Sequence, residues 1–211
     1  MKQLWNEWKI HLTWLYPVTA LVFFFLAFSF KPRTQTDLYL LVEVVWPLGL
    51  VLSIASILPL EYEEGMLELR LSYAKPYRHS VIKTLALPHL WWVSVGLLAM
   101  LCCTKGPFFA EIWHLAAVVI PPAIALSGLA LLVSSLTLNA VTSVIVTLAY
   151  WVYEWLNAAA QRKMSLFPYY GGIAQQINIF LNRFFLVAVG LLLYLVAFGI
   201  ITSNEFFARV D

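Results

Sequence analysis

Long apolar runs that contain no charged residue alternate with short polar segments along this chain. Residues 10–30, 84–104 and 184–204 contain no Asp, Glu, Lys or Arg, and each of these runs is 21 residues long. A helix of that length spans about 31 Å at 1.5 Å per residue, which matches the roughly 30 Å hydrocarbon core of a bilayer. Transmembrane strands would be about half as long and would alternate apolar with polar residues, so the runs predict helices.

Two further runs extend the pattern. Residues 38–60 are interrupted only by Glu43, and residues 112–153 lack charge for 42 positions, which is enough for two crossings. The most polar point there is Thr137-Leu138-Asn139, where we expect a turn. The sequence therefore predicts an all-α integral membrane fold with six transmembrane helices, at about residues 12–30, 38–60, 82–104, 112–136, 140–158 and 184–203.

The composition agrees with lipid as the solvent. Hydrophobic residues make up 62% of the chain and charged residues only 11%, whereas soluble domains carry about 25% charged residues. The net charge of +2 and the lack of a basic tract give no support for a nucleic-acid partner. The adjacent Cys102 and Cys103 cannot form a four-ligand zinc site. We interpret the first apolar run as an uncleaved span, because it is long for a signal peptide.

Two segments outside the predicted spans have mixed character. Residues 1–11 place Leu4 and two tryptophans on one helical face with lysines opposite, which predicts an N-terminal interfacial helix. Residues 159–183 combine Arg162 and Lys163 with aromatic, glycine and amide side chains. That mixture is too polar for lipid and too apolar for a free loop. It therefore predicts a re-entrant or interfacial element before span six.

The segment from Glu61 to Lys83, between the apolar runs 38–60 and 84–104, holds eight of the chain's 24 charged residues. Gly65 follows its acidic start, and Met66, Leu69 and Tyr73 then share one face of a helix. We expect a short helix outside the membrane that a soluble partner binds. A solvated loop that only sets the topology is the alternative.

The same segment resembles the first cytoplasmic loop of permease subunits in the ABC type-2 transporter class, which are membrane subunits of ABC exporters. That loop often reads Glu-x-Glu-x-Gly-x-Leu-Glu-x-x-x-Ser, followed by Pro and a basic residue. This chain matches the pattern in order, with two extra residues before the proline, at Glu61, Glu63, Gly65, Leu67, Glu68, Ser72, Pro76 and Arg78. The family's interfacial helix, six spans and element before span six resemble the whole predicted layout.

The resemblance implies one permease domain over residues 1–211, with an interfacial helix at 1–11, a cytoplasmic coupling segment at 61–80 and an extracellular element at 159–183. It implies a multi-pass protein of the plasma membrane with both termini in the cytoplasm. Lysine and arginine counts of seven and six on the two sides give only weak support for that orientation. Contacts with a cytoplasmic ABC ATPase subunit would come from Glu61, Glu63, Glu64, Met66, Leu67, Glu68 and Arg70.

The ATPase activity is expected on that partner, because this chain has no Gly-x-x-x-x-Gly-Lys-Ser/Thr phosphate loop. The chain itself is therefore not expected to be an enzyme or to hold a cofactor, and ATP and Mg would bind to the ATPase. A second permease subunit, identical or related, is expected to complete the core. Two pairs of small residues four positions apart, Gly49 with Ser53 and Ala130 with Ser134, would allow close helix packing.

Two acidic residues lie inside predicted spans, Glu43 and Glu154. A charge at that depth costs roughly 2.5–3.5 kcal/mol on insertion scales, so each needs a reason. One hypothesis places both on a substrate path in an outer cavity. In the alternative, each is neutral or pairs locally with a Tyr, a Trp or a cation such as Arg162.

Two other functions remain open. An ion-coupled secondary transporter or channel would need charged groups at mid-membrane or broken helices, and a membrane-embedded enzyme or assembly factor is the third reading. A serine protease site at Ser127-Gly128 is rejected, because no histidine follows it in the sequence. The sequence does not choose among drug, peptide and lipid-like substrates.

Overall fold

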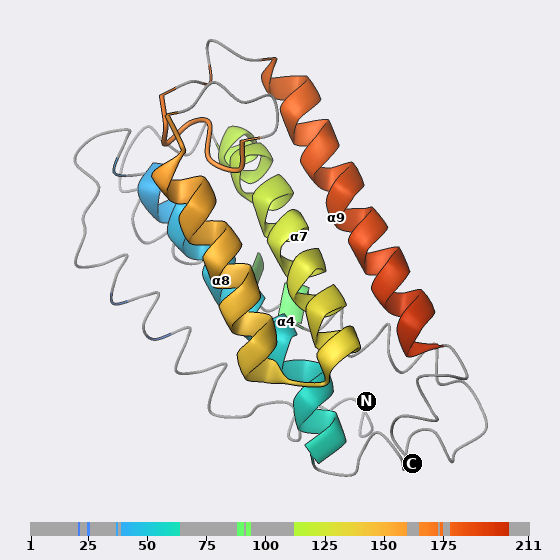
Figure 1. Ribbon diagram of the computed structural model, residues 1–211. Coiled ribbons are helices and arrows are strands. Elements are labelled where there is room, and N and C mark those ends of the chain that lie inside the picture. The colour runs from blue at the N-terminus through green and yellow to red at the C-terminus, as the bar shows by residue number, and fades with distance from the viewer. Residues whose placement is uncertain are drawn as a thin grey trace.

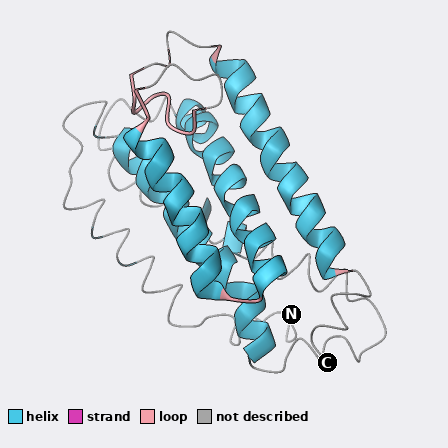
Figure 2. Ribbon diagram, viewed as in Figure 1, coloured by secondary structure: helices cyan, strands magenta, loops and turns pink. Residues whose placement is uncertain are grey.

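The described residues of the chain are helical apart from one short loop and the helix ends. A computed structural model describes residues 21, 25, 37, 39–63, 88–90, 92–93, 112–159, 165–172, 174 and 178–202. No strand occurs among them, and Figure 2 shows the loop against the helices. The predicted interfacial helix at 1–11 lies outside this part of the chain, as do residues 64–80 of the charged segment.

Five helical elements in the described part of the chain form a bundle around one central helix. They are η1 (Leu40–Val45), α4 (Trp46–Glu63), α7 (Ile112–Thr137), α8 (Ala140–Leu156) and α9 (Ile179–Ile201). Helix α7 packs against η1, α4, α8 and α9, and α4 also packs against α8. In Figure 1, α8 and α9 lie on either side of α7, and the loop that joins them lies at one end of the bundle.

Four of the six predicted spans coincide with these helices. Helices α7 and α9 are long and apolar enough to cross a membrane, whereas the apolar parts of η1–α4 and α8 are each 17 residues or shorter. The predicted span at 12–30 has only residues 21 and 25 described, and the one at 82–104 only five residues, all helical. The all-helical fold is thus confirmed, while six crossings remain part of the proposal below.

The turn between α7 and α8 is where the sequence predicted it. Helix α7 ends at Thr137, and Leu138 adopts a positive φ of 50° before α8 begins at Ala140. Asn139 caps α8, because its side-chain oxygen accepts a hydrogen bond of 2.9 Å from the backbone N–H of Thr142. This contact satisfies one of the free N–H groups that every helix start exposes.

A proline inside α4 creates a hydrogen bond between helices. Pro59 has no N–H, so the carbonyl oxygen of Ala55, four residues earlier, loses its partner within the helix. The hydroxyl of Ser134 on α7 donates to that oxygen at 3.2 Å, with both Ala55 and Ser134 fully buried. The proline is therefore compatible with a buried helix because α7 supplies the missing donor.

Small residues allow close approach between elements of the chain. A Cβ added to Gly49 would lie 2.0 Å from the ring of Trp92, whose Nε1 donates to the Ser53 hydroxyl at 3.0 Å. Likewise, a Cβ on Gly128 of α7 would lie 2.7 Å from the carbonyl oxygen of Gly190 on α9. Gly49 and Ser53, read from sequence as a helix-packing pair, thus pack against a residue of the same chain.

The other pair, Ala130 and Ser134, also contacts other helices of the same chain. The carbonyl of Ala130 accepts a hydrogen bond of 2.7 Å from the Ser143 hydroxyl of α8, and Ser134 binds α4 as described above. Neither residue of this pair has exposed surface. Both pairs therefore stabilise the bundle itself.

Candidate functional site

The most polar buried region of the described structure lies where the loop of residues 165–172 meets the bundle. Glu43 reaches this region from η1, whose π-helical turns lead directly into α4. Pro47, just inside α4, has no N–H to donate to the turn before it. The Trp151 indole of α8 donates a hydrogen bond of 2.9 Å to another backbone group of η1, the carbonyl of Val44. Wide π-helical turns of this kind are frequent at functional sites.

Glu43 makes two kinds of contact there. Its carboxylate is fully buried and forms a salt bridge with Arg183 of α9. Its other oxygen accepts a hydrogen bond of 2.8 Å from the backbone N–H of Tyr170 in the loop. An acidic side chain on η1 therefore connects a distant helix to the loop.

Arg183 is 8% exposed and contacts the loop as well as Glu43. Its Nη1 donates to the carbonyl of Leu166 at 3.3 Å, and its guanidinium lies 5.3 Å from the ring centroid of Tyr169, a cation–π distance. Burial raises the pKa of the Tyr169 phenol above its ordinary value of 10, against an opposing effect of Arg183 and with a smaller raising effect of Glu43. Tyr169 is therefore neutral at physiological pH.

Two further side chains bind the start of the loop. The carboxylate of Glu154, on α8, accepts a hydrogen bond of 3.2 Å from the backbone N–H of Leu166. The Asn182 amide, on α9, donates to the carbonyl of Ser165 at 3.0 Å. We refer to Glu43, Glu154, Asn182 and Arg183 as the loop-binding cluster, because each contacts a backbone group of residues 165–172.

The loop also buries apolar side chains. Leu166 and Phe167 have no exposed surface, and the Phe167 ring lies edge-on to Trp151 with 6.3 Å between centroids. Gly171 fits so closely against the residues just after α8 that a Cβ on it would lie 2.0 Å from the carbonyl oxygen of Ala158. A buried loop needs partners for its backbone N–H and C=O groups, and the loop-binding cluster supplies four of them.

A second polar chain crosses the interior of the bundle. The Tyr194 hydroxyl on α9 lies 2.8 Å from Nε2 of His89 and donates to the Ser127 hydroxyl on α7, also at 2.8 Å. Ser127 in turn donates to the carbonyl of Ala123 at 2.6 Å. Because the Tyr194 hydroxyl donates its hydrogen to Ser127, it can only accept the hydrogen bond with His89, which requires the Nε2–H tautomer of that histidine.

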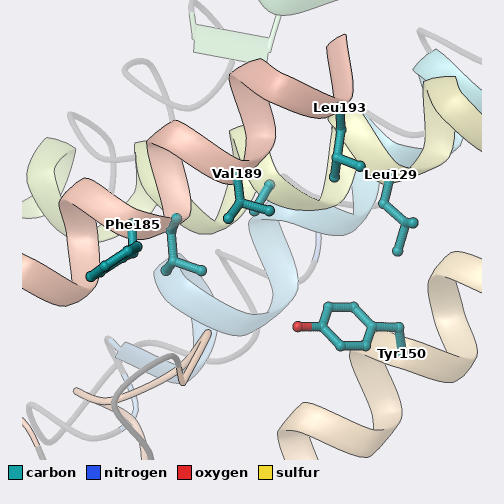
Figure 3. Close-up of a pocket in the computed structure, with 7 residues that line it drawn as sticks. Leu129, Tyr150, Phe185, Val189 and Leu193 are labelled. Atoms are coloured by element: carbon teal, nitrogen blue, oxygen red, sulfur yellow. The ribbon is translucent and has the colours of Figure 1, made fainter. Parts of the chain in front are cut away.

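An apolar groove runs along the bundle between α8 and α9. The cavity has a volume of about 250 Å³, and Figure 3 shows Tyr150 of α8 facing the side chains of α9 across it. Residues of α7 form its floor. The lining residues, all apolar apart from one phenol hydroxyl, are Ala125, Leu129, Tyr150, Phe185, Leu186, Val189 and Leu193.

The two acidic residues read from the sequence as a candidate substrate path, Glu43 and Glu154, lie in the same cluster. Both are buried, at 0% and 5% exposure, and both accept hydrogen bonds from the loop backbone. Contact with a substrate stays a prediction. Local pairing, the alternative reading, is confirmed for Glu43, and its cation is Arg183. Arg162, the cation named from sequence, lies outside the described residues.

Sequence reasoning missed three members of this region. Arg183 and Asn182 were assigned to the polar element before span six, whereas α9 begins at Ile179 and includes both. The sequence does not link Trp151 to this region, because its indole reaches the carbonyl of Val44 only through the contact of α8 with η1. The sequence did contain a signal for Arg183. A buried Glu43 requires a cation as its partner, and Arg183 lies at the start of an apolar run, where it can be buried with that acid.

The residues proposed to contact an ATPase are described only in part. Glu61 and Glu63 belong to the last turn of α4, which continues without interruption into the charged segment. Glu64, Met66, Leu67, Glu68 and Arg70 lie outside the described residues. Within the described ranges, no three His, Cys, Asp or Glu side chains gather in a group that could hold a metal ion.

Comparison with known proteins identifies no relative: no protein-family model, no curated protein and no solved structure matches this chain.

Proposed function

We propose that this chain is the transmembrane permease subunit of an ABC exporter, embedded in the plasma membrane through six spans with both termini in the cytoplasm. A separate cytoplasmic ATPase would bind ATP and Mg and hydrolyse the nucleotide. A second permease subunit, identical or related, would complete the translocation path. The substrate would be a drug, a peptide or a lipid-like molecule moved outward across the bilayer.

The observation that carries this proposal is the ordered motif from Glu61 to Arg78, set between two apolar runs. The structure adds that α4 extends as one helix from Trp46 to Glu63 and therefore reaches the first acidic residues of the motif. A rigid helix that ends in a partner-binding segment can transmit a displacement of that segment into the bundle. This continuity is what mechanical coupling to an ATPase requires.

A second candidate function, an ion-coupled transporter or channel that works without an ATPase, has its own support. His89, Tyr194 and Ser127 form a hydrogen-bonded chain across three elements, and Glu43 pairs with Arg183 in the interior. Ionisable residues inside membrane helices are frequent in proton pathways. These groups are the described features that favour proton movement through the chain.

One purification separates the two candidates. The tagged full-length chain, extracted in a mild detergent, is expected to retain an ATPase that carries the phosphate-loop motif, in stoichiometric amount, and the complex is expected to hydrolyse ATP. The same chain freed of its partner is then placed in liposomes with a pH gradient and a trapped pH-sensitive dye. Purification without an ATPase, together with ATP-independent proton flux through the chain, would replace the first candidate with the second.

A further inference from the structure

Glu43 of the loop-binding cluster and the first residues of the charged segment, 61–63, lie at opposite ends of the η1–α4 element. Glu43 in η1 and Glu63 at the end of α4 are separated by about 30 Å along a helix axis at 1.5 Å per residue. That length equals the hydrocarbon thickness of a bilayer. In Figure 1 the loop joining α8 to α9 lies at one end of the bundle, and α4 extends past the α7–α8 turn at the other end.

The four members of the loop-binding cluster lie on three different helical elements. Glu154, Asn182 and Arg183 belong to α8 and α9, the helices that the loop itself connects, and they hold its start at Ser165 and Leu166. Glu43 comes from the η1–α4 element and holds the other end of the loop, at the N–H of Tyr170. Movement of α4 relative to α8 and α9 would therefore break the contacts of Glu43 with the loop while the contacts of Glu154 and Asn182 persist.

We propose that residues 165–172 form the outer gate of the export path, released by a shift of α4 that separates Glu43 from Tyr170 and Arg183. Leu166 and Phe167 fill the end of the bundle when the gate is closed. The start of the loop stays attached through Glu154 and Asn182 and acts as the hinge. This inference rests on the proposed exporter function for the origin of the α4 movement, but the release of the loop is a property of this chain alone.

Single cysteines report the two ends of the loop in the full-length chain, after Cys102→Ser and Cys103→Ser remove the native thiols. Pro168→Cys lies in the part that would be released, and Ser165→Cys lies at the hinge; both positions are buried. The rate of reaction with a membrane-impermeant maleimide is measured from outside, in intact cells without added nucleotide. Slow labelling at both positions is expected while Glu43 is intact.

Glu43→Gln removes the charge that pairs with Arg183, and Glu154→Gln makes the same chemical change at the hinge. Losing a charged hydrogen bond raises the population of the open state by about tenfold or more, so Glu43→Gln should accelerate labelling at residue 168 by at least about tenfold and leave residue 165 unchanged. Glu154→Gln should not produce this selective increase at residue 168. Should Glu43→Gln fail to fold, as judged by size-exclusion chromatography, Glu43→Asp takes its place with the same expected order of rates.

If Glu43→Gln leaves the labelling rate at residue 168 unchanged, or raises it equally at residues 165 and 168, the proposed gate is wrong. This outcome is independent of whether an ATPase purifies with the chain. A second measurement tests the coupling: trapping the ATPase with nucleotide should accelerate labelling at residue 168 in the chain with Glu43 intact. If Glu43→Gln accelerates labelling at residue 168 but nucleotide does not, the result supports the proposed gate and contradicts the proposed exporter function.

Discussion

Reversal of two charges in the coupling segment, Glu64→Lys with Glu68→Lys, is expected to remove the ATPase from the purified chain. The two carboxylates lie four positions apart, on one face of the predicted helix, where they repel each other unless a basic partner lies between them. Placing like charges across an interface costs several kcal/mol, which lowers the affinity by about a hundredfold or more. The measurement is the amount of ATPase recovered with the tagged chain in mild detergent.

A matched control makes the same change in net charge elsewhere. Asp37→Lys with Glu111→Lys also replaces two acids by two lysines, in segments that the proposed topology places on the outer side. This variant should retain the ATPase at the level of the unmodified chain. Equal loss of ATPase in both variants would show that net charge or folding is responsible, and equal retention in both would remove the coupling segment as the contact.

Replacement of Arg183 by leucine is expected to have the largest effect on stability. The salt bridge with Glu43 is buried, so removal of one partner leaves a buried carboxylate without its cation, at a cost of about 3–5 kcal/mol. For a chain of this size that loss corresponds to a decrease in Tm of roughly 6–20 °C. The chain's nine tryptophans allow unfolding to be followed by intrinsic fluorescence in detergent.

The double variant Glu43→Leu with Arg183→Leu is the control for this effect. Replacing a whole buried ion pair by apolar residues is often neutral, so the double variant should be clearly more stable than Arg183→Leu alone. Arg183→Lys keeps the charge but loses the planar fork that reaches both Glu43 and the carbonyl of Leu166, so an intermediate Tm is expected. If the double variant has a Tm no higher than that of Arg183→Leu alone, the loss of stability does not come from the unpaired Glu43 carboxylate.

The helices could be predicted from the sequence because their signal is local. Charge-free runs and a polar turn placed α7, α8 and the turn at Thr137 to within a few residues, since apolar length and the capping preference of Asn139 act within one segment. The start of α9 was placed five residues too late, at 184 instead of Ile179. The error arose because Asn182 and Arg183 are polar and were read as outside the span.

The candidate site could be predicted only in part, because its contacts join residues far apart in the chain. Glu43 and Glu154 were selected as acids in apolar runs, which is a property of single positions. Their common partner, the loop of residues 165–172, depends on packing between η1, α8 and α9. A buried acid requires a cation, but the sequence does not identify Arg183, 140 positions from Glu43, as that cation. The close contact of the Trp92 ring with Gly49 depends on the same kind of long-range packing.

In the proposed topology the charged segment faces the cytoplasm, where an ATPase can bind it. Ser72→Cys, in a chain that carries Cys102→Ser and Cys103→Ser, tests this claim directly with an impermeant maleimide. We expect rapid labelling in inverted membrane vesicles from which the ATPase has been removed, slower labelling when the ATPase is bound, and no labelling in intact cells. Labelling in intact cells, or labelling only after the bilayer is dissolved in detergent, would contradict the proposed topology.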